Sequence, residues 1–166
     1  MTKKGKHIAK FSASDGILII ANNKKAFHDY EILQCYEAGI SLKGSEVKSI
    51  REGNINLKDT YLKVLDHEVF LIGSHISPYS HSREEDHSTT RDRKLLLHMD
   101  EIEKLFSAIQ QKGLTLVPLK VYFKNRRCKI EIGLGRGKKL YDKREDLKKK
   151  EANREIERGI RKKIAI

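Results

Sequence analysis

The chain contains several short runs of apolar and β-branched residues, separated by turn residues, with no regular strand–helix–strand repeat. In the clearest run, residues 128–134, apolar side chains alternate with Lys129 and Glu131, as in a strand that buries one face. Further strands are predicted over residues 16–21, 61–65, 68–72 and 114–123. Because strands mostly follow one another directly, the pattern favours an antiparallel sheet over a parallel, doubly wound one.

Helical spacing of apolar residues predicts three short helices between these strands. They cover 24–38 (ended by Gly39), 46–52 (capped by Ser45) and a segment with an apolar stripe at Ile102, Leu105, Phe106 and Ile109. Residues 77–93 are predicted to form a long polar loop, and Pro118 indicates a sheet edge or a bulge. The combination predicts a mainly β fold with short helices: an OB-fold-like antiparallel β-barrel with flanking helices.

Charge is concentrated at the C-terminal end of the chain. Lys and Arg number 35 against 23 Asp and Glu, a net charge of +12, of which residues 136–166 carry +7. The apolar residues of that tail form one narrow i+4 row, which buries too little surface to fold alone. The sequence therefore predicts three parts: a flexible basic leader at 1–14, the barrel at 15–135, and a tail at 136–166 that is disordered when free and helical on a partner.

A positive charge of this size favours a polyanionic partner, because basic side chains release the counterions of a phosphate backbone. No apolar run is long enough to span a bilayer, and the N-terminus has no secretory signal, so we expect a cytoplasmic protein with no membrane contact. Cys35 and Cys128 are expected to be small buried hydrophobic residues and not a disulfide.

No motif for catalysis or for a cofactor is complete. Residues 133–139 resemble a phosphate-binding loop, but one residue is missing and Lys139 stands where the loop needs Ser or Thr; a glycine-flexed basic hinge is the better interpretation. His75, His81 and His87 lack the closely spaced cysteines typical of structural zinc. We therefore expect a non-enzyme that binds RNA without a metal or cofactor.

Several strings, in this order, resemble the SsrA-binding protein (small protein B) family. They are residues 20–30 (IANNKKAFHDY), 37–40 (EAGI), 44–53 (GSEVKSIREG), 93–98 (RKLLLH), 113–120 (GLTLVPLK) and 132–145 (IGLGRGKKLYDKRE). The likeness covers roughly residues 7 to 150. It implies an OB-like barrel that binds the tRNA-like domain of transfer-messenger RNA (tmRNA) and carries it to stalled ribosomes in trans-translation, acting as a monomer.

The resemblance also implies site residues. Those matching the family's RNA face are Asn23, Lys24, Glu37, Leu96, Lys129 and Lys139. Those matching the segment that reaches the ribosomal decoding centre and mRNA channel are Gly137, Lys138, Tyr141, Asp142, Lys143 and Arg144. Lys and Asn suit phosphate and 2′-OH contacts, and an exposed Tyr141 suits stacking on a base. Glu37 could equally be a solvated charge at a helix end, and Leu96 a core residue.

The chain departs from the family pattern in three places: it keeps lysine at 24–25 where arginine is frequent, and it differs at 86–89 and at Gly135-Arg136, where Ala-Lys is more usual. Two alternatives remain open. A general ribosome-associated barrel protein or RNA chaperone would share the charge and fold but not the ordered strings. An RNA-modifying enzyme would need a cofactor loop or metal cluster.

Overall fold

The structure is a computed structural model that describes residues 11–12, 16–79, 88–139, 141–142, 151–156, 158 and 160. Its strands are β1 (Phe11–Ser12), β2 (Ile17–Asn22), β3 (Tyr30–Ile40), β4 (Ile55–Asn56), β5 (Tyr61–Leu65), β6 (Glu68–Ile72), β7 (His75–Ile76), β8 (Arg93–Leu96), β9 (Thr115–Lys124) and β10 (Arg127–Gly137). Its helices are α1 (Lys24–Asp29), α2 (Gly44–Arg51) and α3 (Met99–Lys112). The prediction of a mainly β fold with short helices is confirmed.

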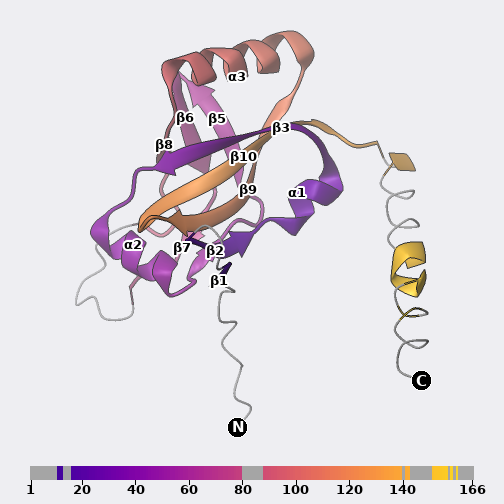
Figure 1. Cartoon of the computed structure of the whole chain (residues 1–166). Coiled ribbons are helices and arrows are strands. Elements are labelled where there is room, and N and C mark those ends of the chain that lie inside the picture. The colour runs from indigo at the N-terminus through magenta and orange to yellow at the C-terminus, as the bar shows by residue number, and fades with distance from the viewer. Residues whose placement is uncertain are drawn as a thin grey trace.

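Eight strands form one antiparallel sheet in the order β1-β2-β9-β10-β3-β8-β6-β5, and β4 pairs with β7 in a second, two-stranded sheet. The long strand β10 lies in the middle and pairs with both β9 and β3. The sheet curls strongly, so that the end strand β5 also contacts β9 (Figure 1). This is the predicted OB-fold-like architecture.

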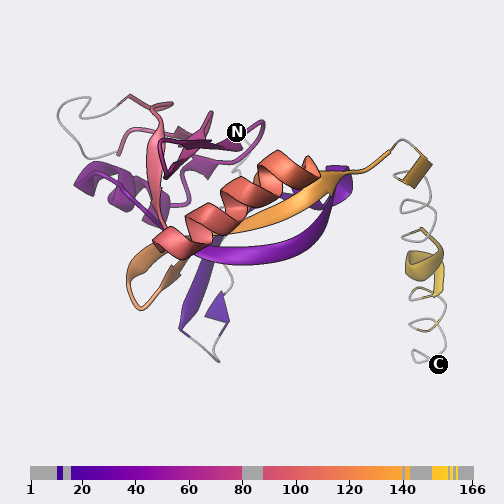
Figure 2. The ribbon, with the colours of Figure 1, turned by 90° about the horizontal axis from the view of Figure 1, so that it is seen from above.

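The apolar core fills the inside of the curl. Its fully buried members include Leu71 of β6, Leu105 of α3 and Ile132 of β10, so sheet and helix contribute to one cluster. Helix α3 lies across the sheet over β3 and β10 (Figure 2). Its predicted apolar stripe is confirmed at Ile102 and Leu105, whereas Phe106 remains 46% exposed. Gly113, at φ 58°, ends the helix in the left-handed conformation that favours glycine.

The prediction of a helix over 24–38 is wrong beyond its first turns. Helix α1 ends at Asp29, and Tyr30–Ile40 is the strand β3. Gly39, predicted to end the helix, lies inside that strand opposite Lys129 of β10. The spacing of apolar residues in this segment is compatible with both a helix and a strand. The segment forms a strand because its backbone pairs with β10, which lies far away in sequence.

The predicted short helix at 46–52 is α2, which begins two residues earlier. Ser45 is not its cap, because Lys43 occupies the N-cap and the Glu46 side chain accepts a hydrogen bond of 2.7 Å from the Lys43 backbone N–H. The hairpin of β5 and β6 turns at Asp66 and His67, as predicted, with both residues at positive φ. The predicted loop 77–93 is shorter than expected at its end, since Arg93 begins β8; residues 80–87 lie outside the described part.

Two further expectations concern β9 and β10. The bulge predicted from Pro118 is confirmed, because the register of β9 against β10 shifts between Glu131 and Ile132, the residue opposite Pro118. The glycine-flexed hinge is wrong for Gly133 and Gly135, which are buried within β10. A Cβ on Gly135 would stand only 2.6 Å from the carbonyl oxygen of Glu31, so this glycine permits close strand packing.

Candidate nucleic-acid interface

Four strands present one row of residues on the side of the sheet that faces away from the core. In register, Tyr122 of β9 lies opposite Lys129 of β10, Lys129 opposite Gly39 of β3, and Gly39 opposite Leu96 of β8. We call this side the outer face and define it by Lys120, Tyr122, Lys129, Glu131, Glu37 and Leu96. The alternation of β10 that buries Ile130 and Ile132 in the core turns Lys129 and Glu131 outward.

Leu96 belongs to this outer face and not to the core. Its side chain is 55% exposed, whereas the neighbouring Leu95 is 1% exposed and packs inside. Leu96 lies over Gly39, since a Cβ added to that glycine would come within 3.2 Å of the Leu96 Cβ. An exposed leucine held in a fixed place beside basic side chains offers an apolar surface for an unstacked base.

Glu37 lies at the centre of a hydrogen-bonded cluster on β3. Its carboxylate accepts a hydrogen bond of 2.6 Å from the Tyr122 hydroxyl and one of 3.2 Å from Lys124, and it stands 3.5 Å from Lys129 Nζ. The Tyr122 hydrogen bond, with help from Lys124 and Lys129, holds the pKa of Glu37 below its ordinary value. The acid is therefore charged at neutral pH and orients two lysines; the alternative of a helix-end charge is wrong, because Glu37 is in a strand.

The sequence did not predict a role for Lys120, Tyr122 and Glu131 of the outer face, nor for Lys124 of β9, which bonds to Glu37. Lys120 forms an ion pair of 2.8 Å with Glu131, and its Nζ lies 5.7 Å from the centre of the Tyr122 ring. Burial and the bond to Glu37 raise the pKa of Tyr122. The alternation of these residues with the buried Val121 and Phe123 was the signal that could have identified them.

Asn23 joins α1 to the sheet. It is the N-cap of α1, where its Oδ1 accepts a hydrogen bond from the Ala26 N–H, and its Nδ2 donates to the carbonyl of Pro118 at 3.0 Å. Its backbone N–H donates to the carbonyl of Leu119 at 2.7 Å. Asn23 therefore fixes α1 to the bulged part of β9, and Lys24, which follows it, is exposed at the start of the helix.

Helix α1 and the outer face lie on the same side of the sheet. Ala26 of α1 packs on Val117 and Leu119 of β9, and the Leu119 side chain covers the position where Gly133 would carry a Cβ, at 3.1 Å. Gly133 shares its side of β10 with Lys129 and Glu131. The structure thus brings Asn23, Lys24, Glu37, Leu96 and Lys129 together on one surface.

The chain leaves the barrel beside α1. Lys138 donates its backbone N–H to the carbonyl of Asp29 at 2.9 Å, and its Nζ donates to the carbonyl of Phe27 at 3.1 Å. Lys139 follows, exposed, and its backbone N–H donates to Asp142 at 3.2 Å. Lys139 is therefore held near α1 by the bonds of its neighbour.

The residues predicted for the ribosome fall at this exit and after it. Gly137 pairs with Tyr30 as the last residue of β10, and a Cβ built on it would meet no described residue other than its chain neighbours within 4 Å. Tyr141 is 70% exposed and, like Asp142, helical. Lys143 and Arg144 lie outside the described residues. Residues 151–156, 158 and 160 are helical and exposed where described.

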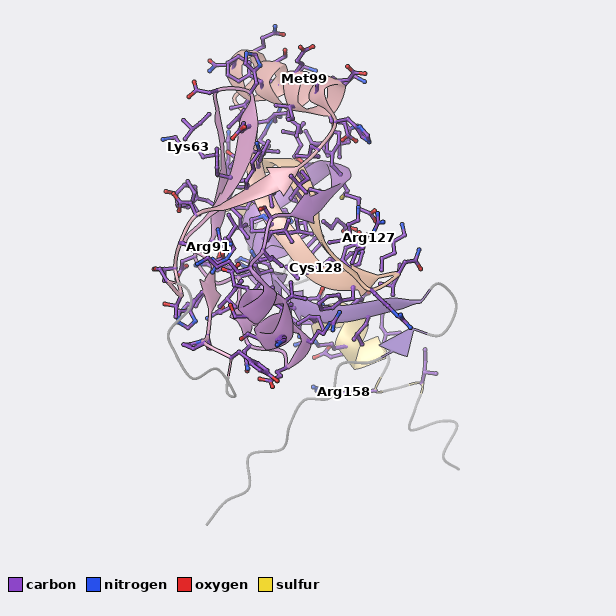
Figure 3. All side chains as sticks on the ribbon, turned by 90° about the vertical axis from the view of Figure 1, so that its left-hand side faces the viewer. Lys63, Arg91, Met99, Arg127, Cys128 and Arg158 are labelled. Atoms are coloured by element: carbon purple, nitrogen blue, oxygen red, sulfur yellow. The ribbon has the colours of Figure 1, made fainter. Side chains whose placement is uncertain are left out.

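A buried ion-pair network joins α2 to β8. Glu46 of α2, fully buried, accepts hydrogen bonds from Arg93 at 2.9 Å and from Arg91, which lies beside α2 (Figure 3). Arg93, also fully buried, donates further to the carbonyls of Ser74 and Thr89. Burial opposes ionisation of Glu46, but the bonds from Arg91 and Lys43 outweigh it and lower its pKa. The network fixes the strand that carries Leu96.

The described residues offer little for other chemistry. No group of three His, Cys, Asp or Glu within them could hold a metal ion, and no helix within them could span a membrane. Both cysteines are free in the structure; Cys35, expected to be buried, is exposed on β3. Burial raises the pKa of the Cys128 thiol to about 12, so that thiol stays protonated at neutral pH.

The curled sheet, with lysines of α1, β9 and β10 on one side of it, places this chain among the small β-barrel proteins of the RNA-binding class. Within that class it belongs to the SmpB protein family, whose model matches residues 20–162.

Individual relatives agree with this assignment. The SsrA-binding protein of Acetivibrio thermocellus is 58% identical over 143 residues, which cover 86% of this chain and 93% of the relative. That of Carboxydothermus hydrogenoformans is 55% identical over 143 residues, covering 86% and 96%. A solved structure described as "tmRNA-SmpB: a journey to the center of the bacterial ribosome" matches with a TM-score of 0.60 and 47% identity, covering 72% of this chain and 85% of that one.

Proposed function

We propose that this chain binds the tRNA-like domain of tmRNA and delivers it to stalled ribosomes for trans-translation, in which the nascent chain is tagged for degradation. Family membership and the tmRNA–ribosome context of the related solved structure support this function. The observation that carries it is the shared surface of Asn23, Lys24, Glu37, Leu96 and Lys129. These residues match the family and come from four separate segments: the start of α1, β3, β8 and β10.

Each residue has a physical role in this proposal. Lys24, Lys129 and Lys139 neutralise phosphates, and Leu96 contacts an unstacked base. The negative charge of Glu37 repels a phosphate, so Glu37 does not bind the RNA backbone directly. It holds Lys124 and Lys129 in fixed positions and so makes the surface specific for one RNA shape. Asn23 acts mainly by fixing α1, since its side-chain oxygen and nitrogen both have partners in the protein.

The tail has a separate role in the proposal. Residues 136–166 carry +7 and form a helix in the empty mRNA channel, with Gly137, Lys138, Tyr141, Asp142, Lys143 and Arg144 at the decoding centre. The exposed Tyr141 ring stacks on a ribosomal base there. The chain acts as a monomer in the cytoplasm, where the ribosomes are, and it needs no cofactor because it makes and breaks no bonds.

A competition experiment tests the RNA preference. The tRNA-like domain and bulk tRNA are titrated against one labelled tRNA-like domain over a series of salt concentrations. We expect the preference for the tRNA-like domain to persist as salt is raised, because nonspecific phosphate binding weakens first. Equal affinities would contradict the proposal and favour a general RNA chaperone. Turnover of any RNA by the purified protein would instead indicate a modifying enzyme.

A further inference from the structure

Lys138, the first residue after β10, is bound to the C-terminal end of α1 by both its main chain and its side chain. Its backbone N–H donates to the carbonyl of Asp29 at 2.9 Å, and its Nζ donates to the carbonyl of Phe27 at 3.1 Å. Both carbonyls belong to the last turn of α1, and the Lys138 side chain is half-buried there. The start of the tail and the end of this helix are therefore one contact.

The end of α1 needs donors of this kind. The last four carbonyls of an α-helix have no partner within the helix. In α1 the N–H of Tyr30 bonds to the carbonyl of Ala26, and Lys138 supplies donors to those of Phe27 and Asp29. The partial negative charge at a helix C-terminus also favours a lysine ammonium group. Because a helix of six residues is too short to be stable by itself, these contacts matter for its last turn.

The beginning of α1 is held without Lys138. Asn23 caps it and bonds to the carbonyls of Pro118 and Leu119 of β9, and Ala26 packs on the same strand. Lys24, which is proposed to contact RNA, follows Asn23 directly. Loss of the Lys138 bonds should therefore loosen the last turn of α1 and the start of the tail, and leave Lys24 in place.

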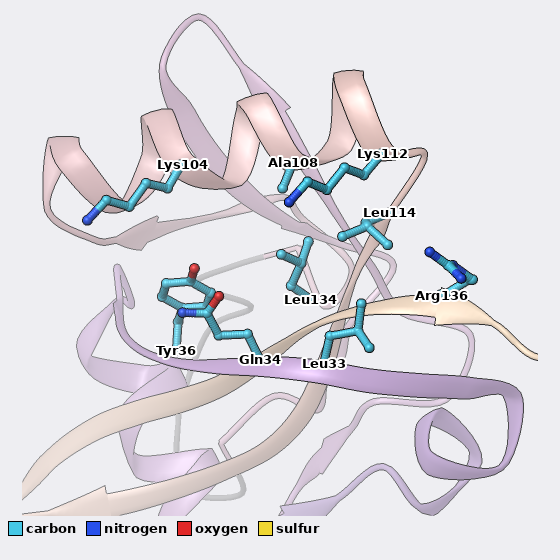
Figure 4. Close-up of a pocket in the computed structure, with 9 residues that line it drawn as sticks. All are labelled: Leu33, Gln34, Tyr36, Lys104, Ala108, Lys112, Leu114, Leu134 and Arg136. Carbon is cyan, nitrogen blue, oxygen red and sulfur yellow. The ribbon is translucent and has the colours of Figure 1, made fainter.

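The basic residues on either side of Lys138 have different surroundings. Arg136 lines the space under α3 together with Lys112 and lies on the α3 side of β10 (Figure 4). Lys139 is exposed, and the bond that it makes among the described residues runs from its backbone N–H to Asp142. The contact with α1 is therefore a property of Lys138 and does not follow from the basic charge that it shares with its neighbours.

We propose that Lys138 is a positioning residue: it fixes the direction in which the tail leaves the barrel, and its ammonium group stays on α1 and does not contact RNA. Since α1 also carries Lys24, one helix then sets both a part of the RNA-binding surface and the start of the tail. The benefit for tagging, a tail already directed towards the mRNA channel, rests on the proposed function. The fixed direction in the free protein does not.

A distance measurement on the free, full-length protein tests the fixed direction. Spin labels are placed on Cys35, which is exposed on β3, and on Tyr141→Cys, in a chain that carries Cys128→Ala. Double electron–electron resonance then gives the distribution of distances between the labels. We expect one narrow distribution, and a distribution about two-fold broader or more in Lys138→Met, because a helix end that loses its partners frays. Methionine keeps the length of the side chain and removes the donor.

Two further variants control this measurement. Arg136→Met removes the same charge at a nearby position on the α3 side of β10, and it should leave the distribution unchanged. Lys138→Arg keeps a cationic donor and should restore a narrow distribution. Equal widths in the unmodified protein and in Lys138→Met, or equal broadening by Arg136→Met, would overturn the proposal.

RNA titrations separate positioning from direct contact. Each lysine that binds a phosphate adds about 1 to the slope of log affinity against log salt. For the tRNA-like domain, Lys138→Met should leave this slope unchanged, whereas Lys139→Met should lower it by about 1. For the small ribosomal subunit, the comparison variant is Arg144→Met, from the segment proposed for the decoding centre. A slope lowered equally by Lys138→Met and by the comparison variant would show that Lys138 binds a phosphate.

A reconstituted tagging reaction connects the tail direction to function. Lys138→Met should lower the yield of tagged peptide about five-fold or more, because a tail without a fixed direction has a lower effective concentration at the channel. Lys138→Arg should restore most of the yield. Full tagging by Lys138→Met would contradict the positioning role. Failure of the proposed function would instead appear as absence of tagging by the unmodified protein, with the distance distributions still as expected.

Discussion

The Tyr122 hydroxyl donates a hydrogen bond of 2.6 Å to the Glu37 carboxylate, and this bond reaches over β10 to join β9 with β3. Glu37 is an acid on a surface that we propose binds RNA, and its partners are side chains of that same surface. Its charge holds Lys124 and Lys129 at defined positions, so the lysines are already arranged before RNA arrives. Preorganisation of this kind favours specificity over bulk charge.

Tyr122→Phe should raise the pKa of Glu37 towards its ordinary value, because the Tyr122 bond is the largest influence that lowers it. The ring stays in place, so the free energy of unfolding should fall by only about 1 kcal/mol. Following the carboxyl carbon of Glu37 by NMR during a pH titration measures the shift. An unchanged Glu37 pKa would show that the lysines alone hold the carboxylate; Tyr61→Phe, on an exposed tyrosine of β5, is the control.

Leu96→Ala should weaken binding of the tRNA-like domain about ten-fold, equivalent to about 1.4 kcal/mol, while leaving the fold intact. Its neighbour provides the matched control, since Leu95→Ala removes a fully buried side chain and should cost about 2–5 kcal/mol of stability. Urea unfolding and RNA titration of both variants separate the two roles. A large loss of stability in Leu96→Ala, with unchanged RNA affinity, would show that Leu96 stabilises the fold and does not contact RNA.

Glu46→Gln should destabilise the protein at neutral pH by about 3–5 kcal/mol, because it leaves the buried Arg93 without its counter-charge. The pKa of Glu46 is lowered by folding, so its ionised form stabilises the native state above the ordinary value of 4.5. That contribution is lost as pH falls through the lowered pKa. The stability difference between the two proteins, from urea unfolding at several pH values, should therefore be largest above pH 4.5 and shrink below it. A difference that stays constant with pH would contradict this.

Removal of residues 140–166 should leave binding of the tRNA-like domain within about three-fold while abolishing tagging on stalled ribosomes. The cut keeps Lys138 and its two bonds to α1, and it keeps Lys139. Affinity is measured by RNA titration and tagging by the appearance of tagged peptide in a reconstituted translation reaction. Tagging by the shortened protein would disprove the role proposed for the tail.

Local signals in the sequence predicted the elements whose structure is decided locally. The β5–β6 hairpin follows from two apolar runs around Asp66-His67, and α3 from its stripe and from Gly113. The helix predicted for residues 30–38 was wrong, because this segment forms a strand by pairing with β10, which lies far away in sequence. Local spacing of apolar residues carries no information about such a partner.

The candidate site shows the same division. The resemblance named Glu37 and Leu96, but only the register of β3 with β8 and β10 shows that they share a surface. Tyr122 was not predicted, because its role depends on the hydrogen bond to Glu37 of β3, a strand that is not adjacent to β9.

The central strand β10 connects the outer face to the start of the tail. From Lys129 on the outer face to Gly137 at the exit, eight residue steps of extended chain span about 26 Å, and pairing with β3 along this length keeps the strand from sliding. Lys138 is then tied to α1. The fold therefore fixes the distance between the outer face, where we propose that the RNA binds, and the residue at which the tail begins.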